Sequence, residues 1–398
     1  VTSTQNEAEK LVADLNDLIG EDKVYQFFAD DVAAAEFIFA SLDKSITRLE
    51  TMAFLRDESK TGIVVTSLTG MRVLLPSPKA YEQGEFQFEV GQEYDLDDLV
   101  KRLTNVGYEK VSQVSNPGEF SRRGDILDIF EISQAQPYRL EFFGDEIDGI
   151  RYFDSESQKS LEQVEHVLVA PADDVILAPA DFARAIKILE DKLEVATEEQ
   201  RAYLSDVLSA SQNGYKHKDI RRFLSIFYER EWTLLDYVPK GTPVFYDDFQ
   251  KIVDRNAKLD LELANLLTED LQQGKAFSSL TYFADSYKSL RQYQPATFFS
   301  NFHKGLGNLK FDKLHNLTQY PMQEFFNQFP LLVDEINRYK KSKATVLLQV
   351  DSHKGLEKLQ ESLQEYGLEL PITEASAILP KEAQILVGHL SAGFYFAD

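Results

Sequence analysis

The sequence contains no cysteine among its 398 residues. Disulfide bonds and thiolate metal sites are therefore excluded, and this absence fits a protein of a reducing compartment. The chain also lacks any run of about eighteen apolar residues and any basic segment followed by an apolar one, which argues against a membrane span or a secretory signal. We therefore expect a cytoplasmic protein with no membrane partner.

Positive charge is scarce as well. The chain has 42 Lys and Arg against 66 Asp and Glu, so its formal net charge is −24 and its pI is about 4.7. Nucleic-acid binding draws its affinity from clustered Lys and Arg, and strong direct binding of DNA is therefore not expected. Hydrophobic residues make up 43% of the chain and can fill several domain cores. A protein is the expected kind of partner.

Motifs of common catalytic sites are missing. The chain has no GxxxxGK[ST] phosphate loop, no glycine elbow of a serine hydrolase and no histidine pair at i, i+4. Asp247 and Asp248 follow a short apolar strand, where a Walker B acid would hold Mg²⁺, but such an acid needs phosphates. We expect the matching phosphate loop to precede Val1 and interpret the pair as an acidic strand end. No catalytic residue and no metal site is predicted.

Two weaker features have simple structural interpretations. The pattern Gly305-Leu306-Gly307 lacks a fitting strand and helix and is predicted to be a turn. The acidic pairs Asp97-Asp98 and Asp173-Asp174 are interpreted as a helix start and a solvated loop, respectively, because carboxylates suit the helix dipole or water.

The first part of the chain alternates between strand and helix patterns, which predicts an α/β fold with a parallel sheet flanked by helices. A later segment supplies further strand candidates, so we expect a discontinuous Rossmann-like parallel-sheet domain made of residues 1–85 and 240–310. The predicted strands lie at 1–4, 23–28, 63–66, 242–248, 279–283 and 296–300, and the predicted helices at 8–19, 31–42, 46–55 and 252–273.

Three further parts are expected. Residues 86–170 hold short runs rich in Ile, Phe, Leu and Tyr between tight-turn residues, which is typical of a small inserted antiparallel β domain. Residues 171–239 have helical patterns and predict a helical subdomain. Residues 311–398 predict a separate C-terminal α/β domain, with a helix at 324–341. The last strand pair looks unfinished, so we expect the sequence to be a part of a longer protein.

One strand of the β domain is especially informative. Its two-residue period divides six residues between two faces: Tyr138, Leu140 and Phe142 on one, and Arg139, Glu141 and Phe143 on the other. The first face is apolar and can be buried, so the second exposes a guanidinium, a carboxylate and a phenyl ring, which Arg123 can join. An exposed aromatic beside an arginine is typical of protein interfaces. Cover of Phe143 by a loop or by another domain is an equal alternative.

Residues 117–154 also carry a resemblance to a known family. The runs are PGEF at 117–120, RGDILDIF at 123–130, YRLEFFGDEID at 138–148 and RYFD at 151–154. They resemble the module shared by the excision-repair protein UvrB and the transcription-repair coupling factors. The connection at 56–62 is too short for the DNA-clamping hairpin of UvrB, and the region after 311 is unlike the helicase half of UvrB. The resemblance is therefore closer to the coupling factors.

The resemblance implies a function. Coupling factors use a polymerase-binding domain and a motor driven by ATP and Mg²⁺ to remove stalled RNA polymerase from damaged DNA, and then recruit UvrA. The positions that match the family's UvrA-binding residues are Arg123, Arg139 and Phe143. We therefore expect a non-catalytic adaptor for transcription-coupled nucleotide excision repair that needs no cofactor itself. The alternative is the ATP-binding part of a UvrB-like DNA helicase, with Asp247 at its Mg²⁺ site.

Overall fold

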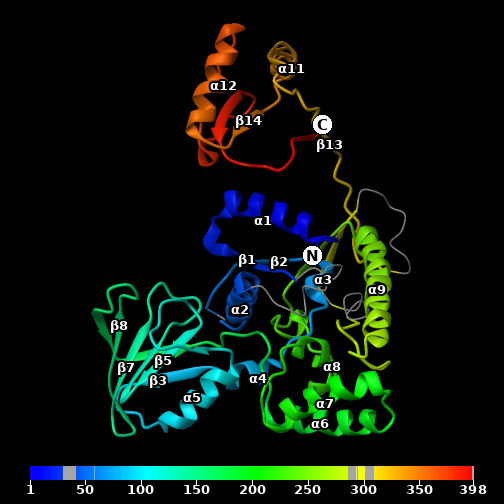
Figure 1. Ribbon diagram of the computed structural model, residues 1–398. Coiled ribbons are helices and arrows are strands. Elements are labelled where there is room, and N and C mark those ends of the chain that lie inside the picture. The colour runs from blue at the N-terminus through cyan, green and yellow to red at the C-terminus, as the bar shows by residue number, and fades with distance from the viewer. Residues whose placement is uncertain (30–41, 58, 286–292, 294, 301–308, 397–398) are drawn as a thin grey trace. The chain divides into compact units, whose positions relative to one another are not determined.

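The computed structural model describes most of the chain (Figure 1). The described residues are 1–29, 42–57, 59–285, 293, 295–300 and 309–396. Of the predicted helix at 31–42, residues 31–41 lie outside this set, as does the turn predicted at 305–307. The chain divides into two compact units, residues 1–8 with 25–307 and residues 9–24 with 308–398. Among the described helices, none combines the length and apolar character needed to cross a membrane.

A mixed α/β fold is present, and its first sheet joins segments that are far apart in sequence. β1 (Val24–Phe27) pairs with β2 (Ile63–Thr66), and β11 (Val244–Asp247) pairs in parallel with β12 (Ala296–Phe299). Residues 1–2 lie between these pairs. The amide of Thr2 donates to the Thr66 carbonyl at 3.0 Å, and the amide of Asp247 donates to the Val1 carbonyl at 2.9 Å. Backbone hydrogen bonds of residues 1–2 thus connect the two strand pairs.

Helices of the first unit follow the apolar periodicity of the sequence. They include α2 (Leu42–Arg56), α5 (Leu96–Asn105), α6 (Pro179–Glu194), α7 (Glu198–Gln212), α8 (Leu224–Phe227) and α9 (Phe249–Gln272). α2 and α9 lie where helices were predicted, at 46–55 and 252–273. α1 (Gln5–Ile19) begins in the first unit, and its residues from 9 onward belong to the second. Asp97 and Asp98 lie in the first turn of α5, as predicted, and their amides donate to the Asp95 carboxylate. Such a cap satisfies amides that have no partner within the helix.

The strand predicted at 279–283 is wrong. This segment has no regular secondary structure, and Leu280, Tyr282 and Phe283 are buried in the core of the helical part. That core also receives Leu259 from α9, so it extends well beyond the helical segment 171–239. An apolar run of five residues fits a strand or an irregular core segment equally well, because its period alone does not distinguish them.

The inserted antiparallel sheet has six strands in the order β4-β5-β6-β7-β8-β9. They are β4 (Glu109–Lys110), β5 (Glu119–Arg123), β6 (Ile126–Ile129), β7 (Tyr138–Phe143), β8 (Glu146–Phe153) and β9 (Ser160–Val164). Only the β4–β5 pair is parallel. A separate antiparallel pair is formed by β3 (Phe86–Glu89) and β10 (His166–Val169).

The second unit contains a small α/β core. β14 (Val346–Val350) and β15 (Ala383–Val387) are parallel, and α11 (Phe329–Lys341) and α12 (His353–Glu365) contribute buried Leu, Ile and Val. The predicted helix start at 324 is wrong by five residues. Phe326 and Asn327 have φ of 42° and 62°, a left-handed conformation that a right-handed helix excludes.

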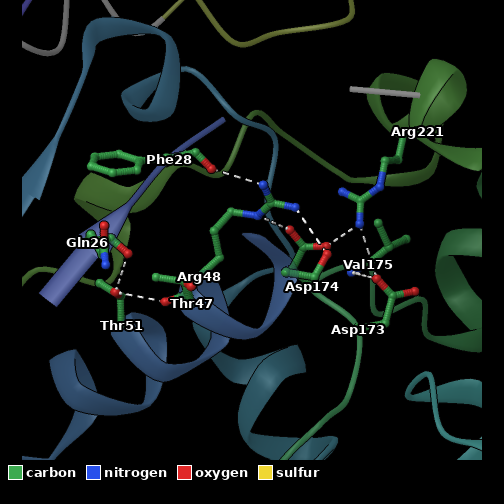
Figure 2. A network of polar contacts seen from close by, with 10 residues as sticks. Gln26, Phe28, Thr47, Arg48, Thr51, Asp173, Asp174, Val175 and Arg221 are labelled. Carbon is green, nitrogen blue, oxygen red and sulfur yellow. Dashed lines mark hydrogen bonds and ion pairs between the residues drawn. The ribbon is translucent and has the colours of Figure 1, made fainter. Parts of the chain in front are cut away.

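One buried carboxylate connects three segments of the first unit, as Figure 2 shows. Asp174, which follows β10, accepts a hydrogen bond from Arg48 Nε of α2 at 2.6 Å and pairs with Arg221 of the helical part. Arg221 also contacts Asp173 at 3.3 Å. Burial alone would raise the pKa of Asp174, but the charges and hydrogen bonds of the two arginines hold it well below its usual range. The interpretation of this acidic pair as a solvated loop is therefore wrong for Asp174, which is fully buried.

Removal of this carboxylate tests its structural role. Asp174→Asn leaves the buried guanidinium of Arg48 without its counter-charge, so we expect the free energy of unfolding in urea to fall by about 3–5 kcal/mol. The folded-state pKa of Asp174 is lowered, so its stabilisation is present above its unfolded pKa of about 4 and is lost as the pH falls below that value.

The matched control is Asp148→Asn, which removes an exposed carboxylate. We expect this change to alter the free energy of unfolding by less than about 0.5 kcal/mol. Equal effects of the two substitutions would contradict the role assigned to Asp174.

Candidate protein-binding surface

Side chains of β7 alternate between the core and the surface, as predicted from the sequence. Tyr138, Leu140 and Phe142 are buried, whereas Phe143 is 85% exposed. Phe143 is thus one of the most exposed large apolar side chains in the described part of the chain. An exposed phenyl ring on a rigid strand end is available for contact with another molecule.

Two tight turns bring Phe143 and Arg123 to the same end of the sheet. Arg123 pairs with Ile126 across Gly124 and Asp125, and Phe143 pairs with Glu146 across a second Gly-Asp turn. The amide of Phe142 donates to the Asp125 carbonyl at 2.8 Å, which connects the end of β7 to the β5–β6 turn. Both glycines have positive φ, 61° at Gly124 and 66° at Gly144, as type II′ hairpin turns require at their first position.

A buried carboxylate lies between the two predicted arginines. Asp128 of β6 is 0% exposed and accepts hydrogen bonds from Arg139 Nε to Oδ1 at 2.7 Å and from Arg139 Nη2 to Oδ2 at 2.9 Å. Arg123 Nη2 donates to the same Oδ2 at 2.8 Å. Two positive charges thus share one negative charge. The hydrogen bonds with Asp128 raise the pKa of Arg139, against the effect of burial.

The two arginines differ in their access to solvent. The side chain of Arg123 is 48% exposed, whereas that of Arg139 is 13% exposed. The guanidinium of Arg139 also lies over the ring of Phe153, with its Cζ 4.4 Å from the ring centroid. The sequence pattern predicts that Arg139 faces water together with Phe143, but in the structure Asp128 and Phe153 cover most of it.

A second ion pair borders this group. Arg151 of β8 is the cross-strand neighbour of Arg139, and its Nη2 donates to Glu141 Oε2 at 2.6 Å. Both side chains of this pair are about one-third exposed. Cross-strand neighbours share one face of a sheet. The registers therefore place Arg123, Asp128, Arg139, Glu141 and Phe143 on the same face of the sheet.

Sequence reasoning missed Asp128. A signal was present, because the acid interrupts the apolar run from Ile126 to Phe130. A charged residue inside such a run is seldom buried unless it is paired, and two arginines lie nearby in the sequence. The pairing itself depends on the strand register, which the sequence does not display.

Residues 1–7 surround the acidic end of β11. Residues 1–2 lie beside β11, and Ser3 and Thr4 connect them to α1. Glu7 of α1 accepts hydrogen bonds there from Ser3 Oγ at 2.6 Å and from the Thr4 amide at 3.3 Å. Burial opposes ionisation of Glu7, but these hydrogen bonds and the charge of Lys251 lower its pKa. A carboxylate thus lies at the start of α1, a place where helix dipoles favour anions.

The pKa of Asp247 is raised, first by burial and then by the charge of Glu7. Two carboxylates therefore stand close to the loop that leads into α1. In the described residues, no group of three or more His, Asp or Glu side chains is arranged to hold a metal ion.

Comparisons with known proteins find one matching domain model and relatives that are similar along the whole chain. Residues 86–174 match the model of the UvrB interaction domain. Over 99% of its length the chain is 29% identical to the transcription-repair-coupling factor of Bacillus subtilis (strain 168), and over its whole length it is 28% identical to that of Staphylococcus aureus (strain bovine RF122 / ET3-1). The chain spans 34% and 35% of these two relatives. The matched domain contains the six-stranded sheet and Arg123, Arg139 and Phe143.

Substitution of the turn glycine tests the geometry that presents Phe143. Gly144→Ala places a Cβ at a backbone φ of 66°, so we expect it to lower the free energy of unfolding by about 1–2 kcal/mol. Nothing lies within 4 Å of this Cβ, so backbone strain is the only cause. Urea denaturation measures the effect.

Gly149→Ala is the control for this prediction. Gly149 lies in β8 at an ordinary φ, and an added Cβ meets its nearest atoms at 3.9 Å, an ordinary contact distance. We expect this variant to be as stable as the parent or slightly more stable. A greater loss at Gly149 than at Gly144 would contradict the assigned turn geometry.

Proposed function

We propose that this chain is the UvrA-recruiting adaptor part of a transcription-repair-coupling factor. The premise is its similarity along the whole chain to these factors, together with its UvrB interaction domain. In this proposal the chain functions in transcription-coupled nucleotide excision repair. The observation that carries the proposal is the exposed ring of Phe143 at the same end of the sheet as Arg123.

The chemistry of this surface suits a protein partner. Phe143 acts as the apolar anchor, and full burial of its ring contributes about 1.5–3 kcal/mol to binding. Arg123 and Arg139 supply the guanidinium groups of the surface, and charge-assisted hydrogen bonds from such groups are the stronger kind. The net charge of −24 disfavours DNA as a direct ligand.

We further propose that this part binds no nucleotide and catalyses no reaction. Glu7 caps the start of α1 with a carboxylate of the chain itself, and Asp247 adds a second acid nearby. Phosphates brought to this loop would meet these two carboxylates, whose charge Lys251, 3.5 Å from Glu7, balances only in part, and the sequence has no phosphate-loop motif to supply a further lysine. In the whole protein, RNA polymerase and DNA bind through other regions, and ATP and Mg²⁺ serve a motor outside this chain.

Recruitment is tested with purified UvrA and isothermal titration calorimetry. We expect the chain to bind UvrA and Phe143→Ala to weaken binding by about 2 kcal/mol or more, because the variant loses the apolar anchor. The control is Leu261→Ala, which removes another exposed apolar side chain from α9, 63% exposed, and retains helix propensity. We expect the control to bind like the parent. Equal affinities of the parent and Phe143→Ala would refute the site.

The helicase alternative makes a separate prediction. An ATP-binding part would bind ATP with Mg²⁺, and Asp247→Ala would abolish this binding. We expect no saturable binding of a fluorescent ATP analogue by the parent chain at millimolar Mg²⁺. Saturable binding that disappears in Asp247→Ala would establish the alternative.

A further inference from the structure

We propose that His389 is a proton-dependent clamp that holds the C-terminal part of α1 against the α/β core of the second unit. The clamp consists of Asp14 and Asp17 of α1, residues 388–391 directly after β15, and Asp351 directly after β14. All of these residues belong to the second unit. None of them is part of the surface proposed to bind UvrA, so this inference goes beyond the proposed function and does not depend on it.

Two carboxylates of α1 accept hydrogen bonds from the segment after β15. Ser391 donates to Asp14 twice, from its amide to Oδ1 at 2.6 Å and from Oγ to Oδ2 at 2.7 Å. The amide of His389 donates to Asp17 Oδ2 at 2.9 Å. Hydrogen bonds that an ionised group accepts are stronger than neutral ones. The helix is thus attached to this segment by backbone groups as well as by side chains.

Gly388 allows the close approach of the helix. A Cβ added at this position would lie 2.9 Å from Asp17 Oδ2 and 3.0 Å from Gln349 Nε2, too close for an ordinary contact. The amide of Gly388 also donates to the Val350 carbonyl at 3.0 Å, which holds the segment at the end of β14. The carboxylate of α1 therefore fits directly against backbone that is fixed to the sheet.

The imidazole of His389 lies between two elements that both carry negative charge. Its Nδ1 is 3.1 Å from Asp351 Oδ1, after β14, and its Nε2 is 3.9 Å from Asp14 Oδ1, on α1. A neutral imidazole has one N–H, whereas an imidazolium has two and can donate in both directions. The protonated ring thus links two elements whose carboxylates would otherwise repel each other.

The surrounding charges favour the protonated ring. The hydrogen bond with Asp351 raises the pKa of His389 most, and the charges of Asp351, Asp14 and Asp17 raise it further, against a small effect of burial. A histidine whose pKa is raised in the attached state stabilises that state fully below its ordinary pKa of about 6.5. This contribution is lost as the pH rises through the raised pKa. The attachment of α1 is therefore weaker at pH 8 than at pH 6.

Hydrogen exchange followed by mass spectrometry measures the attachment directly, because the amides of His389 and Ser391 are themselves donors in the clamp. We expect their protection, corrected for the intrinsic pH dependence of exchange, to fall about threefold between pH 6 and pH 8, the size expected of exposed ion pairs. In His389→Gln, which carries no charge, we expect the protection at pH 6 to equal that of the parent at pH 8. The control His315→Gln removes another exposed histidine of the same unit and should keep the pH dependence of the parent.

Loss of a carboxylate from α1 tests the other side of the contact. We expect Asp14→Ala to lower the protection of the Ser391 amide at least about tenfold at both pH values, because the amide loses its acceptor. Alanine retains the helix propensity of this position. The matched control is Glu361→Ala, which removes an exposed carboxylate from α12 and should leave the protection of Ser391 unchanged.

Titration of the imidazole is an independent measurement, made by exchange of its C2 hydrogen. We expect His389 to titrate at a higher pH than His315, and Asp351→Asn to move the midpoint of His389 toward that of His315. A midpoint of His389 at or below that of His315 would overturn the proposal. Equal protection of residues 389–391 at pH 6 and pH 8, or an Asp14→Ala variant that exchanges like the parent, would overturn it as well.

Discussion

Several buried carboxylates of the first unit are held by arginine, and these pairs connect segments that are distant in the sequence. Asp174 is the central case, because it pairs with Arg48 from α2 and with Arg221 from the helical part, while it lies itself at the exit of the β domain. A fully buried charge is tolerated only when opposite charges and hydrogen bonds replace the lost water. Asp174 therefore holds the three segments together, and loss of either ion pair would lower the stability of the fold considerably.

The same arrangement recurs at two other places with different consequences. In the helical core, Asp270 accepts hydrogen bonds from Arg222 at 2.9 Å and 3.0 Å and from Tyr282 at 2.5 Å. On the sheet, Asp128 holds Arg139 inward while Arg123 remains half exposed. A chain with 66 acidic and 42 basic residues has carboxylates in excess, so its arginines are readily bound within the molecule. Arg123 is notable in such a chain, because about half of its side chain remains exposed to solvent.

Two features bear on function: the side chains that these ion pairs leave exposed on the sheet, and the start of α1. The sheet presents a phenyl ring and a partly satisfied guanidinium at the end shared by two hairpin turns, a combination suited to contact with protein. The start of α1, which in nucleotide-binding proteins of similar topology receives phosphate, is capped by Glu7. The adaptor role proposed above, which includes no nucleotide chemistry, accounts for both features.

Local periodicity in the sequence was enough to predict the helices α1 and α9, the helical character of residues 171–239 and the two faces of β7, since each of these depends on neighbours a few residues away. The pattern alone did not decide whether Phe143 is exposed or covered. The register between strands, by contrast, decided that Asp128 meets Arg139 eleven residues later. Burial of Asp174 required Arg48, which is 126 residues distant. The irregular segment at 279–283 was likewise decided by packing against helices elsewhere in the chain. Such long-range pairings leave no periodic trace in the sequence, so only the tertiary structure determines which charged side chains are enclosed and which remain to meet a partner.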